Sequence, residues 1–232
     1  MAEIQGRSVL VVGASGALGS LIAGELSRQG ALLTLHGRDA ARVTAIGVPG
    51  ATVTGDLRDP SKATALVEAA VAAHGCLDGV VIASGVVAFG PIGSVDDDVL
   101  DDLFLIDVLA PIRITQAALP HLTQSAQDGR APFIASISGV VAEQPMAGMA
   151  AYSAAKAALM AYDVAAAREL RRAGIRMIDV RPPHTETGLA TRPIAGTAPR
   201  LPQGLDPQGA AYRIVTAITA DETDLPSSAF TS

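Results

Sequence analysis

The sequence predicts an α/β domain built around a parallel β-sheet. Short apolar segments alternate along the chain with longer Ala-rich segments. Several of the short segments are nearly continuous in apolar residues, which is typical of strands covered on both faces. Such alternation favours parallel strands joined by right-handed helical crossovers. The 232 residues contain no linker and no repeat beyond this alternation, so we expect a single domain over 1–232.

The same pattern predicts six strands and five helices. The strands are expected at 8–13, 31–37, 51–55, 79–84, 132–138 and 176–181, and the helices at 17–29, 60–74, 95–124, 149–173 and about 206–220. Residues 182–207 hold six prolines and no clear periodicity, which predicts a long loop. Because this loop follows the sixth strand, we expect it to cover a substrate at the carboxyl ends of the strands, where open α/β sheets bind ligands.

Composition and charge argue against several classes of protein. Hydrophobic residues make up 49% of the chain, the formal net charge is −6, and there is no run of Lys or Arg, which argues against a nucleic-acid partner. The N-terminus lacks the basic and apolar regions of a signal peptide, and no apolar run reaches the roughly 20 residues that span a bilayer. The single cysteine, Cys76, excludes an intramolecular disulfide and favours a reducing compartment. We therefore expect a cytoplasmic protein with no membrane partner; a secreted protein without disulfides is the alternative.

A glycine-rich turn separates the first strand from the first helix. Gly13, Gly16 and Gly19 lie in "VGASGALG", and glycine there lets the backbone turn tightly and approach a pyrophosphate. The helix N-terminus adds free N–H donors and partial positive charge. The structural alternative is a tight strand–helix turn that needs glycine for steric reasons alone. Because the turn follows the first strand, we expect a nucleotide to contact its residues, namely Gly13, Ser15, Gly16, Ala17, Leu18 and Gly19.

The ends of the next strands indicate which dinucleotide is bound. No acidic residue closes the second strand, and Arg38 follows its last glycine; a guanidinium can pair with a 2′-phosphate. This pattern favours NADP(H), with NAD(H) as the alternative and a surface loop charge as the structural interpretation of Arg38. Asp56, followed by Leu57, comes just after the third strand, where its carboxylate can accept a hydrogen bond from an adenine amino group. The structural alternative, which is compatible with that role, is a turn or N-cap residue before the next helix. Small residues close the fourth strand, as backbone packed against a ribose and nicotinamide requires: Ala83, Ser84 and Gly85.

Tyr152 and Lys156 are spaced four residues apart at the start of an Ala-rich run. On a helix this spacing places them about 6 Å apart along the axis and on nearly one face. A phenol titrates near 10 in water, and a neighbouring ammonium favours the phenolate by lowering its pKa. The pair is therefore suited to acid–base work on an alcohol or a carbonyl while a cofactor carries the hydride. The alternative is surface decoration, because this spacing is common by chance.

With these motifs in order, the sequence resembles the short-chain dehydrogenase/reductase family over nearly its whole length. The motifs are "VGASGALG", "GDL", "IASG", "AAYSAAKAAL" and the Pro-x-x-x-x-Thr of Pro182 to Thr187. The resemblance implies a doubly wound Rossmann fold with helices on both faces, and NAD(P)-dependent alcohol oxidation or carbonyl reduction. It implies that Tyr152 is the acid/base and that Lys156 is its electrostatic and ribose-binding partner. It also places Pro182, Thr187 and the backbone near Thr185 at the nicotinamide and diphosphate region.

The sequence departs from the family pattern in several places. The middle glycine of the first loop, Gly16, stands one place early, and "IASG" replaces the usual Asn-Asn-Ala-Gly after the fourth strand. Pro183 takes the place of the glycine that usually follows Pro182. The helix asparagine that anchors a water in the family's proton relay matches Asp107. An aspartate can still hold a water there, but it adds charge and donates no hydrogen bond unless it is protonated.

The largest departure concerns the family's serine, which normally lies thirteen places before the tyrosine. That position is Gly139 here, and Ser138 is one place further away. We expect the intervening loop to absorb the extra residue, so that Ser138 points at the substrate, because loop length varies more easily than a strand end. Ser136 shares a face of the strand with Ser138 but lies deeper. The alternatives are that both serines only pack in the strand end, and that the hydroxyl is missing, which costs about 10²–10³-fold in rate for one such donor.

The remaining candidates concern metals, partners and the long loop. His184 either contacts substrate or phosphate, or is an ordinary loop residue. His36, His74 and His121 show no spacing typical of a metal site, so no metal is expected. The helices at 95–124 and 149–173 carry broad apolar faces. Family members commonly dimerise through these two helices, which implies a homodimer or homotetramer, although packing within the chain explains the faces about as well.

The sequence thus predicts an NADP(H)-preferring oxidoreductase that interconverts a small carbonyl and a secondary alcohol. Its predicted catalytic residues are Tyr152, Lys156, Ser138 and Asp107. Two alternatives stay open. Asp107 and Gly139 are also compatible with a non-catalytic nucleotide-binding sensor or scaffold of the same fold. An epimerase or dehydratase would use the cofactor only transiently.

Overall fold

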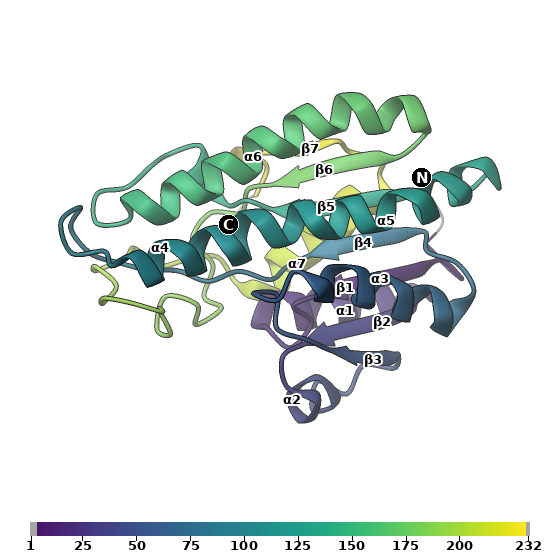
Figure 1. Cartoon of the computed structure of the whole chain (residues 1–232), viewed down its shortest axis with the longest axis horizontal. Helices are drawn as coiled ribbons and strands as arrows, with labels where there is room; N and C mark the ends of the chain where they lie inside the picture. The colour runs from purple at the N-terminus through teal and green to yellow at the C-terminus, as the bar shows by residue number, and fades with distance from the viewer. Residues whose placement is uncertain (1–3, 231–232) are drawn as a thin grey trace.

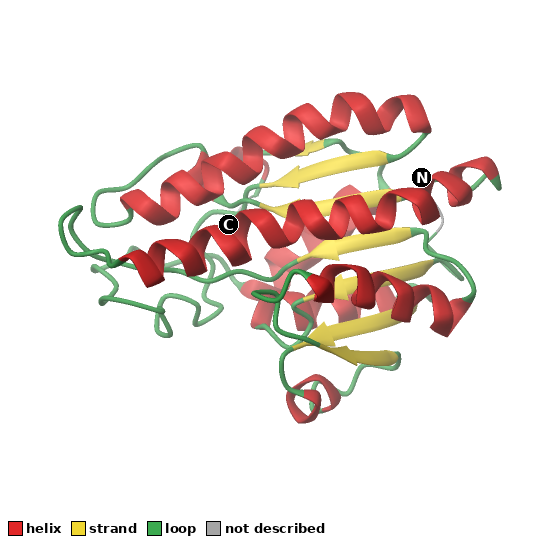
Figure 2. Ribbon diagram, viewed as in Figure 1, coloured by secondary structure: helices red, strands yellow, loops and turns green. Residues whose placement is uncertain are grey.

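A seven-stranded β-sheet forms the centre of the computed structural model, which describes residues 4–230 (Figure 2). Its strands are β1 (Ser8–Val12), β2 (Leu32–Gly37), β3 (Ala51–Thr54), β4 (Gly79–Ile82), β5 (Phe133–Ile137), β6 (Arg176–Val180) and β7 (Asp224–Leu225). They lie in the order β3-β2-β1-β4-β5-β6-β7, and every neighbouring pair is parallel. The predicted fold class is confirmed. The sequence pattern missed β7, which at two residues is too short to show a period.

Seven α-helices cover the two faces of this sheet in the described part of the chain. They are α1 (Ala17–Arg28), α2 (Ala40–Thr44), α3 (Ser61–His74), α4 (Asp97–Phe104), α5 (Ala110–Gln127), α6 (Ala150–Leu170) and α7 (Pro207–Thr219). Short 3₁₀ turns lie at Val140–Ala142, Arg171–Ala173 and Ser227–Ala229. Helices α3, α5 and α6 lie in front of the sheet in Figure 1, and α1 and α7 lie behind it.

The core is split between the two faces because successive strand residues point to opposite sides. In β1, Val9 and Val11 pack with the apolar side of α1, whereas Leu10 and Val12 pack with the side covered by α3 and α5. All four side chains are fully buried. This arrangement explains why the strand segment is continuously apolar, and it fixes the carboxyl ends of the strands at one edge of the sheet.

Helices α4 and α5 form one continuous helix, joined by the π-helical turn Leu105–Leu109. A π-helical turn widens the helix by one residue, and such turns are frequent at functional sites. This turn contains Asp107. Among the described residues, the helix over 97–127 is the one that is long and apolar enough to cross a membrane by length and composition; half of its most apolar window is buried inside the protein, as in a core helix.

The long loop expected at 182–207 lies between β6 and α7, beyond the carboxyl ends of the strands (Figure 1). It pairs with the segment that follows β4. The Ile194 N–H donates to the Val87 carbonyl at 2.9 Å, and the Phe89 N–H donates to the Ala195 carbonyl at 3.0 Å. These bonds hold the loop and the end of β4 together at the edge where a ligand is expected.

Candidate active site

The turn between β1 and α1 is shaped by close packing of its glycines. Gly13 has φ +82°, and a Cβ there would lie 2.6 Å from the Ser84 backbone nitrogen. A Cβ on Gly19 would lie 2.3 Å from the Gly13 carbonyl oxygen. A side chain at either position would clash with the backbone, so the steric reason for these glycines is confirmed. The turn also suits a pyrophosphate, because no side chain within residues 4–230 caps the helix start at Gly16 and its first N–H groups remain available.

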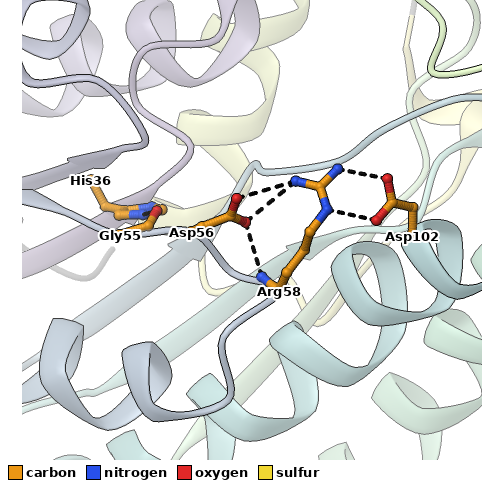
Figure 3. Close-up of polar contacts among 5 residues, drawn as sticks. All are labelled: His36, Gly55, Asp56, Arg58 and Asp102. Carbon is orange, nitrogen blue, oxygen red and sulfur yellow. Dashed lines mark hydrogen bonds and ion pairs between the residues drawn. The ribbon is translucent and has the colours of Figure 1, made fainter. Parts of the chain in front are cut away.

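His36 lies beside Gly55 at the end of β3 (Figure 3) and also bonds to the glycine turn. The Gly13 N–H donates to His36 Nδ1 at 3.3 Å, and His36 Nε2 lies 3.0 Å from the Gly55 carbonyl. Burial lowers the pKa of His36, so the ring is neutral and its Nε2–H donates to Gly55. Sequence reasoning considered His36 only as a metal ligand. Its structural role has no signal in the sequence beyond a histidine inside an apolar strand.

Arg38 and Asp56 lie at the same edge, after β2 and β3. Arg38 is exposed, as access to a phosphate requires. The Asp56 carboxylate accepts a bond from the Arg58 N–H at 3.0 Å and lies 3.3 Å from the Arg58 guanidinium. Asp56 does not cap α3, because Asp59 accepts the Ser61 N–H in that turn. Asp56 thus serves as a turn residue, as the structural alternative predicts, but it is not the N-cap of α3. Leu57 beside it packs into the core.

Tyr152, Lys156 and Asp107 form a buried cluster at the start of α6. Lys156 Nζ lies 5.9 Å from the centre of the Tyr152 ring and 3.4 Å from Asp107 Oδ1, and it donates to the Ile137 carbonyl at 3.0 Å. Tyr152 is 8% exposed and Lys156 is 5% exposed. The helical spacing of the tyrosine and lysine, together with the π-helical turn that carries the aspartate, brings the three side chains together.

The protonation of this cluster differs from what the lysine alone predicts. Burial raises the pKa of Tyr152 above its ordinary value, and the nearby Asp107 carboxylate raises it further. In the chain by itself, burial and Asp107 therefore outweigh the lowering of the Tyr152 pKa that is expected from Lys156. Burial also raises the pKa of Asp107, against the opposing effect of Lys156. Tyr152 is held as a phenol, the form that can donate a proton.

Two buried polar atoms beside this cluster have no hydrogen-bond partner among residues 4–230: Ser84 Oγ and Asp107 Oδ2. The other oxygen, Asp107 Oδ1, accepts the Val86 N–H at 3.1 Å. A Cβ on Gly85 would lie 2.9 Å from Asp107 Oδ1 and 3.4 Å from Lys156 Nζ. Gly85 thus leaves space above a carboxylate and an ammonium, and the orphaned atoms suit a polar ligand such as a ribose and nicotinamide. Ala83 continues the ladder, donating to the Val12 carbonyl at 2.9 Å.

Comparison with known proteins settles the family. The model of the short chain dehydrogenase family matches residues 7–195. The chain belongs to the short-chain dehydrogenase/reductase family. It is 35% identical over 206 residues to an uncharacterised oxidoreductase of Methylorubrum extorquens, which covers 85% of this chain and 81% of that protein.

Solved structures of short-chain dehydrogenases share the fold. One is a short-chain dehydrogenase of Burkholderia cenocepacia in complex with NADP, with 26% identity, a TM-score of 0.83, and coverage of 97% of this chain and 98% of that one. Another is a 3-ketoacyl-(acyl-carrier-protein) reductase of Brucella melitensis complexed with NADH, with 21% identity, a TM-score of 0.86, and coverage of 98% and 100%. This dehydrogenase is therefore an oxidoreductase that uses a nicotinamide cofactor.

The expected role of Ser138 in this dehydrogenase is not found. Its hydroxyl is fully buried and donates to Asp179 Oδ1 at 2.5 Å, so it is directed at β6 and not at a substrate. Asp179 lies on the neighbouring strand β6, and its ion pair with Arg181 fixes the carboxylate that accepts this bond. The family's serine position, Gly139, has φ +85°, and no described atom lies within 4 Å of where its Cβ would be. Ser136 Oγ is likewise buried, without a hydrogen-bond partner in the described range.

The residues that follow β6 fold into local turns. The Pro182 carbonyl accepts the Val140 N–H at 3.0 Å, the Thr185 hydroxyl donates to the Pro183 carbonyl at 2.8 Å, and Thr187 Oγ1 lies 3.4 Å from the Leu189 nitrogen. These bonds place the expected nicotinamide-contacting segment at the carboxyl edge of the sheet. His184 lies 3.5 Å from the Glu186 carboxylate, so the loop supplies it with a partner of its own.

An apolar wall surrounds Tyr152 in the dehydrogenase. The loop after β4, the turn after β5 and the long loop all contribute to it: Val87, Phe89, Val141, Met149, Leu189 and Ile194. A Cβ on Gly196 would lie 1.8 Å from the Phe89 carbonyl oxygen, so the long loop presses directly on this wall. Tyr152 is therefore buried in a largely apolar cluster, which strengthens electrostatic interactions with Lys156 and Asp107.

Proposed function

We propose that this dehydrogenase interconverts a small apolar carbonyl and the corresponding secondary alcohol, with NADP(H) as preferred cofactor and Tyr152 as acid/base. The observation that carries the proposal is the buried cluster of Tyr152, Lys156 and Asp107 at the carboxyl edge of the sheet. Groups with perturbed pKa values in such a place are typical of catalytic sites.

In the reduction direction, each side chain has a distinct task. Lys156 would hold the ribose hydroxyls of the cofactor with its remaining N–H donors, and the chemistry that the cofactor would supply is hydride transfer to the carbonyl carbon. The Tyr152 phenol donates its proton to the carbonyl oxygen, which together with the hydride gives an alcohol and leaves a phenolate. The charge of Lys156 stabilises the phenolate until solvent returns the proton. The raised pKa of Tyr152 favours this direction, because the phenol is the form present at neutral pH.

The NADP(H) preference rests on the end of β2. Arg38 is exposed there and stands where an acidic residue would otherwise accept the ribose hydroxyls. A guanidinium pairs with a 2′-phosphate at this position and has no such partner in NAD(H). We expect Arg38→Asp to weaken NADPH far more than NADH in a fluorescence titration. Equal weakening of both would refute the phosphate role.

The substrate class follows from the apolar wall. Phe89, Met149 and Leu189 offer hydrophobic contacts and no charge to the group beside the carbonyl. We therefore expect turnover of small aliphatic and aromatic ketones. Carboxylated ketones are the matched controls and are expected to react poorly.

The decisive experiment is turnover of such a panel with NADPH, compared between the wild type and Tyr152→Phe. Loss of a general acid lowers kcat by about 10²–10⁴-fold. Full activity in Tyr152→Phe, or no turnover of any carbonyl in the wild type, would overturn the proposal.

A second candidate function is a non-catalytic nucleotide-binding sensor. It is favoured by the direction of Ser138, whose hydroxyl is engaged with Asp179, and by the glycine at position 139. Tight NADPH binding without turnover across the whole panel would support this alternative, and turnover that depends on Tyr152 would exclude it.

We also propose a homo-oligomer that associates through α4, α5 and α6. Four large apolar side chains on these helices and their π-helical link are more than a third exposed: Phe104, Leu109, Leu119 and Val164. Such a patch is more typical of an interface than of a free surface. Light scattering on the purified protein measures the assembly, and replacement of Leu119 and Val164 by Glu is expected to reduce it.

A further inference from the structure

Arg58 and Asp102 form a bidentate ion pair between the loop after β3 and α4 (Figure 3). Arg58 Nε lies 2.6 Å from Asp102 Oδ1, and Arg58 Nη2 lies 2.6 Å from Asp102 Oδ2. The side chains are 32% and 28% exposed, so a charge bound beside them is only partly screened by water.

Three charged side chains are in contact at this corner of the sheet, and Arg38 follows Gly37, whose carbonyl accepts the Gly55 N–H at 3.4 Å beside Asp56. Arg58 also contacts Asp56, at 3.3 Å between Nη1 and Oδ2. The charge of Arg38 acts on the Asp102 carboxylate in addition to that of Arg58, and both lower its pKa. Two guanidinium groups and two carboxylates therefore balance one another, and the corner carries no net charge.

We propose that Asp102 sets the cofactor selectivity of this dehydrogenase by neutralising Arg58 beside the 2′-phosphate position. The proposal rests on the phosphate role proposed for Arg38. Because Arg58 is held by Asp102 and Asp56, its guanidinium is not free to pair with a phosphate, and the Asp102 carboxylate repels the phosphate. The corner thus tolerates both cofactors and favours NADP(H) less than two free guanidinium groups would.

The charge argument fixes the sign of each substitution. In Asp102→Asn the corner gains one positive charge and Arg58 becomes free to turn to the phosphate. In Arg58→Gln the corner gains one negative charge. In the double variant the corner is neutral again. NADH lacks the 2′-phosphate, so these changes in charge should alter its dissociation constant less than that of NADPH. The ratio of the NADH to the NADPH dissociation constant therefore isolates the effect on the 2′-phosphate.

The experiment is fluorescence titration of NADPH and NADH into five folded proteins: wild type, Asp102→Asn, Arg58→Gln, the double variant, and Asp101→Asn as control. Asp101 is exposed on α4 next to Asp102, and its change alters the net charge equally. We expect the ratio to rise about fivefold in Asp102→Asn, to fall by a similar factor in Arg58→Gln, and to return to within about twofold of wild type in the double variant. High salt is expected to shrink each shift.

Several outcomes would overturn the proposal. They are an unchanged ratio in Asp102→Asn, an equal shift in Asp101→Asn, or a double variant that stays as shifted as either single variant. Arg58→Lys gives a further check that does not need the first variants to fold. It keeps the charge and loses the bidentate geometry, so its ratio should stay within about twofold of wild type, and a larger change would assign the effect to geometry instead.

The same titrations separate this proposal from the proposed function. The wild-type ratio alone tests the NADP(H) preference, whereas the change in ratio tests Asp102. A wild type that prefers NADH but shifts as expected in Asp102→Asn would refute only the preference. A wild type that prefers NADPH but does not shift would refute only the role of Asp102.

Discussion

Two buried charged clusters flank the turn that follows β5, and they differ in how completely their charges are paired. In the first, Lys156 has one carboxylate, Asp107, at 3.4 Å, and the second oxygen of that carboxylate has no hydrogen-bond partner in the described part of the chain. In the second, the Arg181 guanidinium pairs with three carboxylates, and one of them also accepts the Ser138 hydroxyl. Lys156 and Asp107 of the first cluster and Arg181 and Asp179 of the second are buried, whereas Asp224 lies at the surface.

The difference distinguishes a ligand site from a structural support. A buried polar group without a partner is costly, and it persists where a ligand completes it. The Lys156 cluster has this character. The Arg181 cluster is complete without a ligand, because Glu143, Asp179 and Asp224 join the turn after β5 to β6 and β7. The position of Ser138 next to the site therefore does not make it catalytic, because its hydroxyl already donates to Asp179 in the structural cluster.

The largest effect is expected from breaking the complete cluster with Arg181→Leu. Removing one partner from a buried ion pair typically costs about 3–5 kcal/mol, because here the Asp179 carboxylate would stay buried without its cation. We expect the free energy of unfolding in urea to fall by about that amount. Arg213→Leu is the matched control, since its pair with Glu222 is about one-third exposed and is expected to cost about 1 kcal/mol or less. Equal losses in the two variants would contradict a structural role for the Arg181 cluster.

Lys156→Met tests the incomplete cluster, and its effect should appear in rate more than in stability. Removing a preorganised positive charge beside the reacting group costs about 10²–10³-fold in kcat. The kcat of carbonyl reduction measures the loss, with the thermal midpoint as a check on folding. A variant that kept full kcat would remove Lys156 from the mechanism.

Asp107→Asn is the companion variant, because it removes the carboxylate that raises the pKa of Tyr152. Without that charge the phenol ionises more easily, so the pH at which alcohol oxidation reaches half its maximum should move to lower pH. A shift to higher pH would show that Asp107 acts on the tyrosine in another way.

The strand positions, the glycine turn and the Tyr152–Lys156 spacing were predictable because each depends on a local sequence pattern. Apolar continuity marks strands buried on both faces, and the spacing of four residues places two side chains on one helix face. The i, i+4 pair therefore indicated the incomplete cluster directly.

The direction of Ser138 and the Arg58–Asp102 pair were not predictable, because each depends on a residue far along the chain. Ser138 bonds to a carboxylate on β6, and Arg58 and Asp102 are 44 positions apart. The pKa of Tyr152 depends on burial that the long loop and the segment after β4 supply together. No local pattern encodes which distant carboxylate a side chain will meet.

Asp163, which lies beside the Arg181 cluster, should make the stability of the protein depend on pH. It lies on α6, lines a cavity of about 400 Å³ together with Asp179 and Arg181, and burial raises its pKa to about 8 from 3.8. The folded chain therefore keeps a proton that the unfolded chain has lost. The resulting stabilisation is full below about pH 4 and is lost as the pH rises through about 8.

We expect Asp163→Asn to remove this dependence. Between pH 6 and pH 8 the free energy of unfolding of the wild type should fall by about 2 kcal/mol more than that of the variant, as measured by urea unfolding at each pH. Asp101→Asn, which changes an exposed carboxylate, should leave the wild-type slope unchanged. Parallel curves for the wild type and Asp163→Asn would place the titration elsewhere.

The smallest effect on rate is expected from Ser138→Ala, and it separates the two clusters most sharply. The variant loses a hydrogen bond to the Asp179 carboxylate, which should lower the free energy of unfolding by about 1–2 kcal/mol. Because the hydroxyl is engaged with Asp179, kcat/KM should stay within about threefold of wild type. A loss near the 10²–10³-fold of a missing oxyanion donor would return Ser138 to the active site.

Gly139→Ser is the reciprocal variant, because it puts a hydroxyl at the position that the family pattern assigns to the serine. No described atom would contact its Cβ, but its φ of +85° strains any residue other than glycine, by about 1–2 kcal/mol. We therefore expect a lower thermal midpoint together with a several-fold higher kcat/KM for carbonyl reduction. A lower midpoint with unchanged kcat/KM would mean that the site polarises its carbonyl without a serine at either position, since neither hydroxyl would then act on the reacting oxygen.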